Sequence, residues 1–154
     1  MTNFAREQWV SALSRVPDDS LQRLADSFPR TWKVTPKALS QSGLGMLKLR
    51  DTTLGEAFYL GEFPLASCWL SVTTDGGESA EGAALVMDER IDRAEQMALC
   101  DAILSGRLPG WERVEALIEE GMDLRAQQSD ERKAILARTR VDFSLLDDVG
   151  DSDA

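Results

Sequence analysis

The N-terminal part of the chain has the apolar spacing of helices. Over residues 4–16 apolar side chains recur every three or four positions, which predicts an amphipathic helix that ends before Pro17. A second, shorter helix follows, because Asp19 and Gln22 have the spacing of a capping box and Pro29 stops the run. Two short helices are therefore expected before the first strand.

The middle of the chain has the pattern of strands. Between Trp32 and Met87, short apolar and β-branched runs are separated by Gly, Asp, Pro and Thr. Residues 66–73 alternate between apolar and more polar side chains, as one buried and one wetter sheet face require. The connections are too short for parallel crossovers, so an antiparallel meander is expected. Its strands are predicted at residues 31–35, 43–50, 56–61, 66–74 and 81–87.

Helical spacing returns in the C-terminal half. A helix is predicted over residues 89–105, and its small side chains Ala94, Ala98 and Ala102 favour close packing on the sheet. A further helical region opens near Pro109 and continues to Ala137. The fold class is therefore α+β, with a meander of four to five strands, N-terminal helices, a middle helix on the sheet and a C-terminal helical region.

The length and the charge define one domain with an acidic end. The 154 residues carry 17 bases and 27 acids, a net charge of −10, and 43% hydrophobic residues, enough for one core. Residues 141–154 hold five aspartates and no base. We therefore expect a single domain over 1–143 and a mobile acidic tail over 144–154.

Several function classes are disfavoured by composition. The acidic balance argues against nucleic acid as a partner. The chain has no histidine and thus no Ser-His-Asp triad, and no apolar stretch approaches the length of a membrane span. Cys68 and Cys100 lack a CxxC spacing and are expected to be reduced, in a cytoplasmic protein without a secretory signal.

Candidate chemical sites are few. The turn at residues 75–78 has the composition of a β-hairpin rather than of a calcium loop. The carboxylate pairs Asp88/Asp92 and Glu115/Glu119 have helical spacing, which is common on solvated helix faces. No glycine-rich phosphate loop is present. The residues thus indicate a poor stand-alone enzyme.

A segment near the C-terminus is the strongest candidate for binding another protein. It combines two arginines with aliphatic and aromatic side chains between a charged helix and the acidic tail, and it alternates like an extended arm. Docking to a partner, folding back onto the chain's own sheet and direct contact with a substrate phosphate all remain open for it. The predicted partner-binding residues are Arg138, Thr139, Arg140, Val141, Asp142 and Phe143.

The same ending resembles the C-terminal signature of the PhnG family, a small subunit of the bacterial carbon-phosphorus lyase core complex. Further segments resemble that family in the same order. They are Arg6, Trp9 and Leu13, residues 32–34, the glycine-led residues 43–50, residues 55–62, Cys68, and the middle-helix residues 94–104. Two departures concern arginines: residues 87–90 replace a Gly-Arg-Asp, and residues 144–148 lack a later aromatic and arginine.

The resemblance implies an accessory subunit that acts with the other core subunits. The complex displaces adenine from MgATP with a phosphonate and forms ribose 1-phosphonate 5-triphosphate. It implies no catalytic residue, metal or cofactor in this chain, MgATP being a substrate of the complex, and it allows homodimerisation within the assembly. Two alternatives are a stand-alone carboxylate-based enzyme or small-ligand-binding protein, and a homo-oligomeric structural protein.

Overall fold

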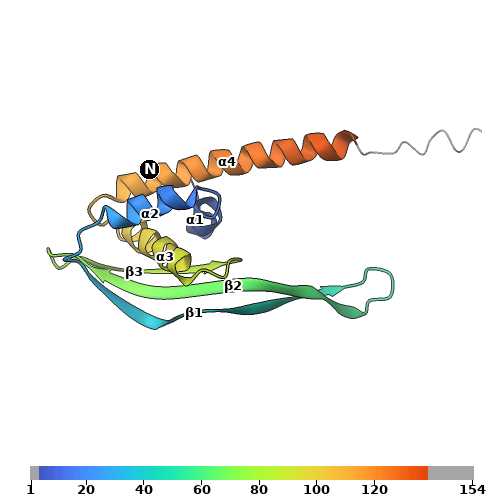
Figure 1. Ribbon diagram of the computed structural model, residues 1–154, viewed down its shortest axis with the longest axis horizontal. Coiled ribbons are helices and arrows are strands. Elements are labelled where there is room, and N and C mark those ends of the chain that lie inside the picture. The colour runs from blue at the N-terminus through green and yellow to red at the C-terminus, as the bar shows by residue number, and fades with distance from the viewer. Residues whose placement is uncertain (1–3, 139–154) are drawn as a thin grey trace, which may run out of the picture.

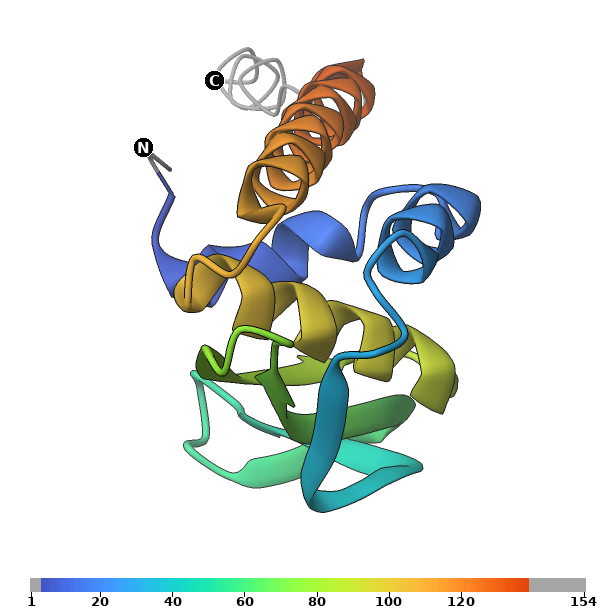
Figure 2. The same cartoon turned by 90° about the vertical axis from the view of Figure 1, so that its left-hand side faces the viewer.

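The computed structural model describes residues 4–138 and shows a three-stranded antiparallel sheet with helices on one face (Figures 1 and 2). The sheet order is β1-β2-β3, so neighbours in sequence are neighbours in space. In chain order the elements are α1 (Arg6–Leu13), α2 (Asp18–Asp26), β1 (Lys33–Arg50), β2 (Ala57–Thr73), β3 (Ser79–Val86), α3 (Ile91–Ser105) and α4 (Trp111–Arg138).

The α+β class and the antiparallel meander are confirmed, but the strand count is wrong. The segments expected at 31–35 and 43–50 belong to one strand, β1, and those at 56–61 and 66–74 belong to β2. The intervening residues shift the register without ending the strands, with irregularities between Pro36 and Ala38 and between Ala38 and Gln41. Pro64 is tolerated because β2 has only β1 as a neighbour there, since β3 ends opposite Ala66.

Two turns close the meander. The tip between β1 and β2 is held by the Asp51 N–H, which donates to the Glu56 carbonyl at 2.8 Å, and Gly55 adopts φ +69°. The second turn, at residues 74–78, pairs the Thr74 N–H with the Glu78 carbonyl at 2.8 Å. The hairpin predicted at residues 75–78 is therefore confirmed.

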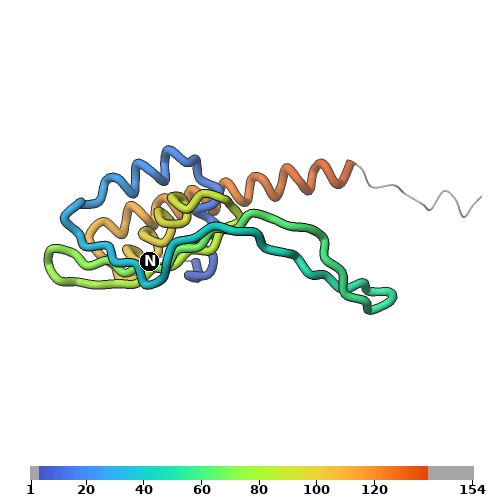
Figure 3. Tube along the Cα trace, turned by 60° about the horizontal axis from the view of Figure 1, so that its bottom comes forward, coloured from blue at the N-terminus to red at the C-terminus, as the bar shows by residue number. Residues whose placement is uncertain are grey.

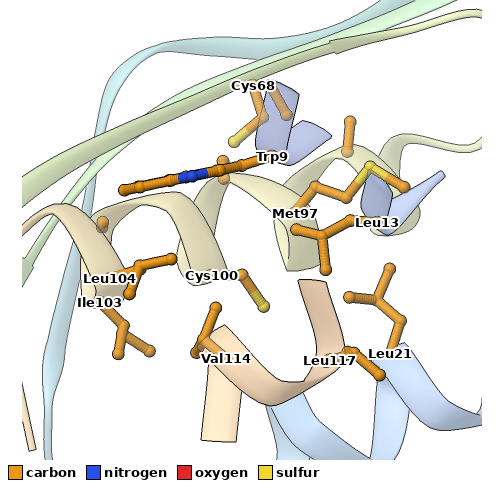
Figure 4. Close-up of a cluster of buried hydrophobic side chains, with 14 of the residues drawn as sticks. Trp9, Leu13, Leu21, Cys68, Met97, Cys100, Ile103, Leu104, Val114 and Leu117 are labelled. Atoms are coloured by element: carbon orange, nitrogen blue, oxygen red, sulfur yellow. The ribbon is translucent and has the colours of Figure 1, made fainter. Parts of the chain in front are cut away.

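The core lies between the sheet and the helices, with α3 at its centre. A Cβ atom on Gly82 of β3 would lie 2.1 Å from the Ala98 carbonyl oxygen, so the glycine lets the α3 backbone approach the sheet directly. The prediction of a small-sided helix close on the sheet is thus confirmed. Met97, Cys100 and Ile103 of α3 pack against side chains of α1, α2 and α4 in the cluster shown in Figure 4. The other helices contribute Trp9, Leu13, Leu21 and Val114.

The C-terminal helix is longer than its packing requires. α4 has 28 residues, but its buried positions end at Gly121, where the glycine packs against the Ala12 backbone. Arg138 is still helical, so the extended arm predicted from about 138 does not begin there. Thr139 to Phe143 and the predicted tail lie outside the described residues.

Candidate partner-binding surface

A two-stranded ribbon extends from the sheet beyond the helices (Figures 1 and 3). It consists of residues 43–65, where β1 and β2 pair only with each other, and is called the β-arm here. Its tip, residues 51–56, is the part of the ribbon farthest from the body. No residue of this ribbon belongs to the buried core, although the distal part of α4 extends on the same side of the body (Figure 1).

The β-arm exposes large apolar side chains along most of its length. Their exposed fractions run from 38% at Leu49 to 73% at Leu54. Isolated soluble domains rarely carry so many adjacent exposed apolar groups, and such patches mark binding surfaces. The exposed set comprises Leu44, Met46, Leu47, Leu49, Leu54, Phe58, Tyr59 and Leu60.

The register assigns these side chains to both faces of the ribbon. Leu44 pairs with Pro64 and Met46 with Glu62, on the face that continues the buried, helix-covered side at Ala66. Gly45 pairs with Phe63 on the opposite face, where the phenyl ring covers the glycine, since a Cβ there would lie 2.7 Å from the ring. Leu47 follows on this second face.

The distal part of α4 forms a second protrusion on the same side of the body (Figure 1). Leu117 and Ile118 are buried in the core, whereas Ile135 and Leu136 are 63% and 59% exposed. Residues 18 positions apart on a helix point in the same direction, about 27 Å apart along the axis. Ile135 and Leu136 therefore form an exposed apolar stripe at the end of α4, on the same side as the core residues and beyond the polar Gln128, which accepts from Arg15 Nη1 at 3.2 Å.

Arg138 lies one turn beyond Ile135, at the end of this stripe. It is the one described residue of the predicted partner-binding segment, and the structure places it beside exposed apolar side chains of α4 rather than in the core. Sequence reasoning did not identify the β-arm as a surface. The available signal was apolar residues at consecutive positions, such as residues 58–60, which cannot all face one core.

Beside β1, a cleft of about 320 Å³ carries the carboxylates Asp92 and Glu95 and the thiol of Cys68. Burial raises the pKa of the Cys68 thiol above its ordinary value, although a hydrogen bond with Ser40 acts in the opposite direction. A neutral thiol is a weak nucleophile, and the negative charge of the neighbouring Glu95 raises the pKa of the thiol further instead of stabilising a thiolate. The cleft therefore lacks the features of a nucleophilic site.

Asp88 and Asp92, which helical spacing pairs in the sequence, have different surroundings in the structure. Asp88 accepts from Arg90 Nη2 at 2.7 Å, which lowers the pKa of Asp88, while Asp92 lines the cleft. Arg90 and the buried Arg93 also contact Asp18. The two arginines and two aspartates thus neutralise one another at the junction of α2 and α3, where the sequence departs from the PhnG pattern. Glu115 and Glu119 lie on α4, away from this cleft.

Residues 4–138 contain neither a cluster of metal ligands nor a helix suited to crossing a membrane. No three His, Cys, Asp or Glu side chains in that range are grouped so that they could hold a metal ion. None of the helices there combines the length and apolarity that crossing a bilayer requires.

The profile of one protein family, described as phosphonate metabolism protein PhnG, matches residues 4–147. This range contains the β-arm, all four helices and most of the segments whose order resembles that family. No curated protein matches the chain significantly. Because the match spans nearly the whole sequence, the chain belongs to the PhnG family, and its role lies in phosphonate metabolism.

Proposed function

We propose that this protein is an accessory, noncatalytic subunit of the carbon-phosphorus lyase core complex. It supports the phosphonate-dependent displacement of adenine from MgATP, which yields ribose 1-phosphonate 5-triphosphate in the cytoplasm. The observation that carries the proposal is the β-arm, an apolar ribbon that the described part of the chain leaves uncovered. The PhnG family match supplies the metabolic setting.

The energetics favour a role in assembly. Covering a large aliphatic or aromatic side chain contributes about 1.5–3 kcal/mol. The arm and distal α4 hold several such groups at half exposure or more, including Leu44, Tyr59, Leu60 and Ile135. Burial of these side chains by another subunit would therefore favour association through the hydrophobic effect.

The electrostatics fit the same role. The β-arm has five charged residues among 23, a smaller share than the 29% of the whole chain. Depletion of charged residues is typical of the buried centre of an interface. Covering the apolar side chains of the arm thus removes few charged groups from water.

The segment Arg138, Thr139, Arg140, Val141, Asp142 and Phe143 belongs to the proposed interface, because it directly follows the exposed stripe of α4. No catalytic residue or cofactor of this chain is part of the proposal, and MgATP binds as substrate of the complex. Reactive groups are supplied by other subunits.

The test is co-expression of the tagged chain with the other core subunits. We expect co-purification of the unmodified chain, and loss of it when residues 43–65 are replaced by Asn-Gly or when the chain is truncated after Ala137. Circular dichroism must show both variants folded. The control is Arg23→Ala, on the exposed side of α2, which keeps association.

Three results would contradict the proposal. One is failure of the unmodified chain to associate, and another is association that survives both the replacement of residues 43–65 and the truncation after Ala137. The third is conversion of MgATP and a phosphonate by the purified chain alone, which would make it an enzyme in its own right.

A further inference from the structure

We infer that the β-arm is inserted into an apolar slot of a partner subunit and is covered there on both faces. This rests on the proposed function and specifies its geometry. A ribbon that docks on a flat surface needs one apolar face and one polar face, as in any half-buried antiparallel sheet. On the β-arm the charged strand residues Lys48, Arg50 and Glu62 all lie on one face, yet large apolar side chains are exposed on both faces.

The consecutive residues Met46 and Leu47 place exposed apolar side chains on opposite faces of the β-arm. Neighbouring residues of a strand point to opposite faces, and these two side chains are 61% and 44% exposed. Leu44 adds to the face of Met46, and Phe63 over Gly45 adds to the face of Leu47. A cover on both faces would bury all of these apolar groups, as in sheets that are covered on both sides.

The edges of the ribbon are less suited to binding than its faces. Pro64 has no N–H to offer an added strand. The register shift between Met46 and Lys48 places an extra residue in β2 beside Gly61 and interrupts regular pairing. Prolines and bulges on edge strands hinder strand addition, so the side chains on the faces are the recognition elements.

The area of the ribbon also requires both faces. β1 contributes residues 43–50, about 27 Å of strand, and a two-stranded ribbon is about 10 Å wide. One face then offers about 270 Å² and both faces about 540 Å². A standard interface covers about 800 Å² on each partner. The two faces of the ribbon together with the apolar end of α4 come close to that area, whereas one face alone does not.

The occupant on the other side is a different protein with two apolar walls, each about 10 Å from the ribbon, the spacing of packed layers. A second copy of this chain is disfavoured by charge, because it would bring another −10 against a chain of −10. The body from which the arm projects is acidic, so a partner with a neutral or basic rim around the slot avoids electrostatic repulsion.

The test compares Met46→Asp with Leu47→Asp, which add the same charge to opposite faces at adjacent positions. Each is measured for affinity to the co-expressed core subunits, and Gln22→Asp on α2 adds an equal charge far from the arm. We expect both arm variants to weaken association at least about tenfold, because each buries an unpaired carboxylate. The Gln22→Asp affinity stays unchanged. Thermal unfolding of the isolated variants checks that they remain folded.

The outcomes separate this inference from the function beneath it. If the unmodified chain does not associate, the proposed function fails. If it associates but one arm variant binds like the unmodified chain, the arm docks by a single face and the insertion is wrong. A mass of two copies for the isolated chain, lost in both variants, would show that the arm binds a second copy instead.

Discussion

The contact between Arg6 and Asp101 provides a quantitative test of how the body is held together. Asp101 on α3 is only 4% exposed. Its carboxylate accepts from Arg6 Nε at 2.9 Å, from Arg6 Nη2 at 2.7 Å and from the Ala83 N–H at 3.0 Å. The pair therefore joins α1, α3 and β3 at one point.

The two ends of this pair are not equivalent, so two substitutions should differ. Arg6→Ala leaves a buried carboxylate with one remaining donor, which costs about 3–5 kcal/mol when a pair is fully buried. The Arg6 side chain is 54% exposed, so we expect a smaller loss of about 2–3 kcal/mol. Asp101→Asn retains an acceptor for Ala83 and leaves Arg6 in water, so about 1–2 kcal/mol is expected.

Urea unfolding followed by circular dichroism measures both variants. Arg6→Ala should lower the unfolding free energy more than Asp101→Asn, and the double variant should cost less than the two single losses together. For a domain of this size the Arg6→Ala loss corresponds to a fall in Tm of about 4–12 °C. Arg23→Ala, an exposed arginine on α2, is the control. An Arg6→Ala loss below about 0.5 kcal/mol, the usual range of surface substitutions, or a larger loss for Asp101→Asn, would refute this reasoning.

Three further predictions concern the core and its margins. Gly82→Ala should destabilise by about 1–3 kcal/mol in urea because its Cβ would meet the α3 backbone, whereas Gly43→Ala, with no atom within 4 Å of the added Cβ, should not. Burial raises the pKa of Cys100 to about 12, so its thiol should resist iodoacetamide until global unfolding; labelling at the rate of a free thiol would contradict this. The lowered pKa of Asp88 stabilises the fold above that group's ordinary value of 3.8, and this stabilisation is lost as pH falls through the lowered pKa. Asp88→Asn should therefore lose less stability in urea between pH 5 and pH 2 than the unmodified protein; an equal loss would contradict the assignment.

The helices and the meander were predictable because their signals are local. The alanines spaced four apart on α3 identify a close-packed helix, and the structure confirms it through Gly82. The strand count failed because Pro36, Gly43 and Pro64 have the character of turn residues. The long strands accommodate these residues through register shifts and, at Pro64, because β2 has no β3 neighbour there. The position at which β3 ends depends on the tertiary fold and not on the local sequence.

The β-arm was missed for a related reason. A strand rich in apolar residues is ordinarily predicted to be buried, and only the tertiary structure shows that the apolar side chains of residues 43–65 are left exposed. At the end of α4 the local sequence predicted the opposite error, a helix that ends too early. Residues 133–138 contain mostly strong helix formers, so the helix continues through Arg138, although the alternation after it suggested an extended segment.

The most direct test of a subunit that contributes binding surface is hydroxyl-radical footprinting of the chain alone and in the co-expressed core complex. Met46 and Tyr59 on the β-arm are 61% and 60% exposed, and buried Met97 is the internal reference. We predict that oxidation of Met46 and Tyr59 falls several-fold on assembly while Met97 stays unreactive in both states. Equal oxidation of the β-arm in the free chain and in the complex would contradict the account.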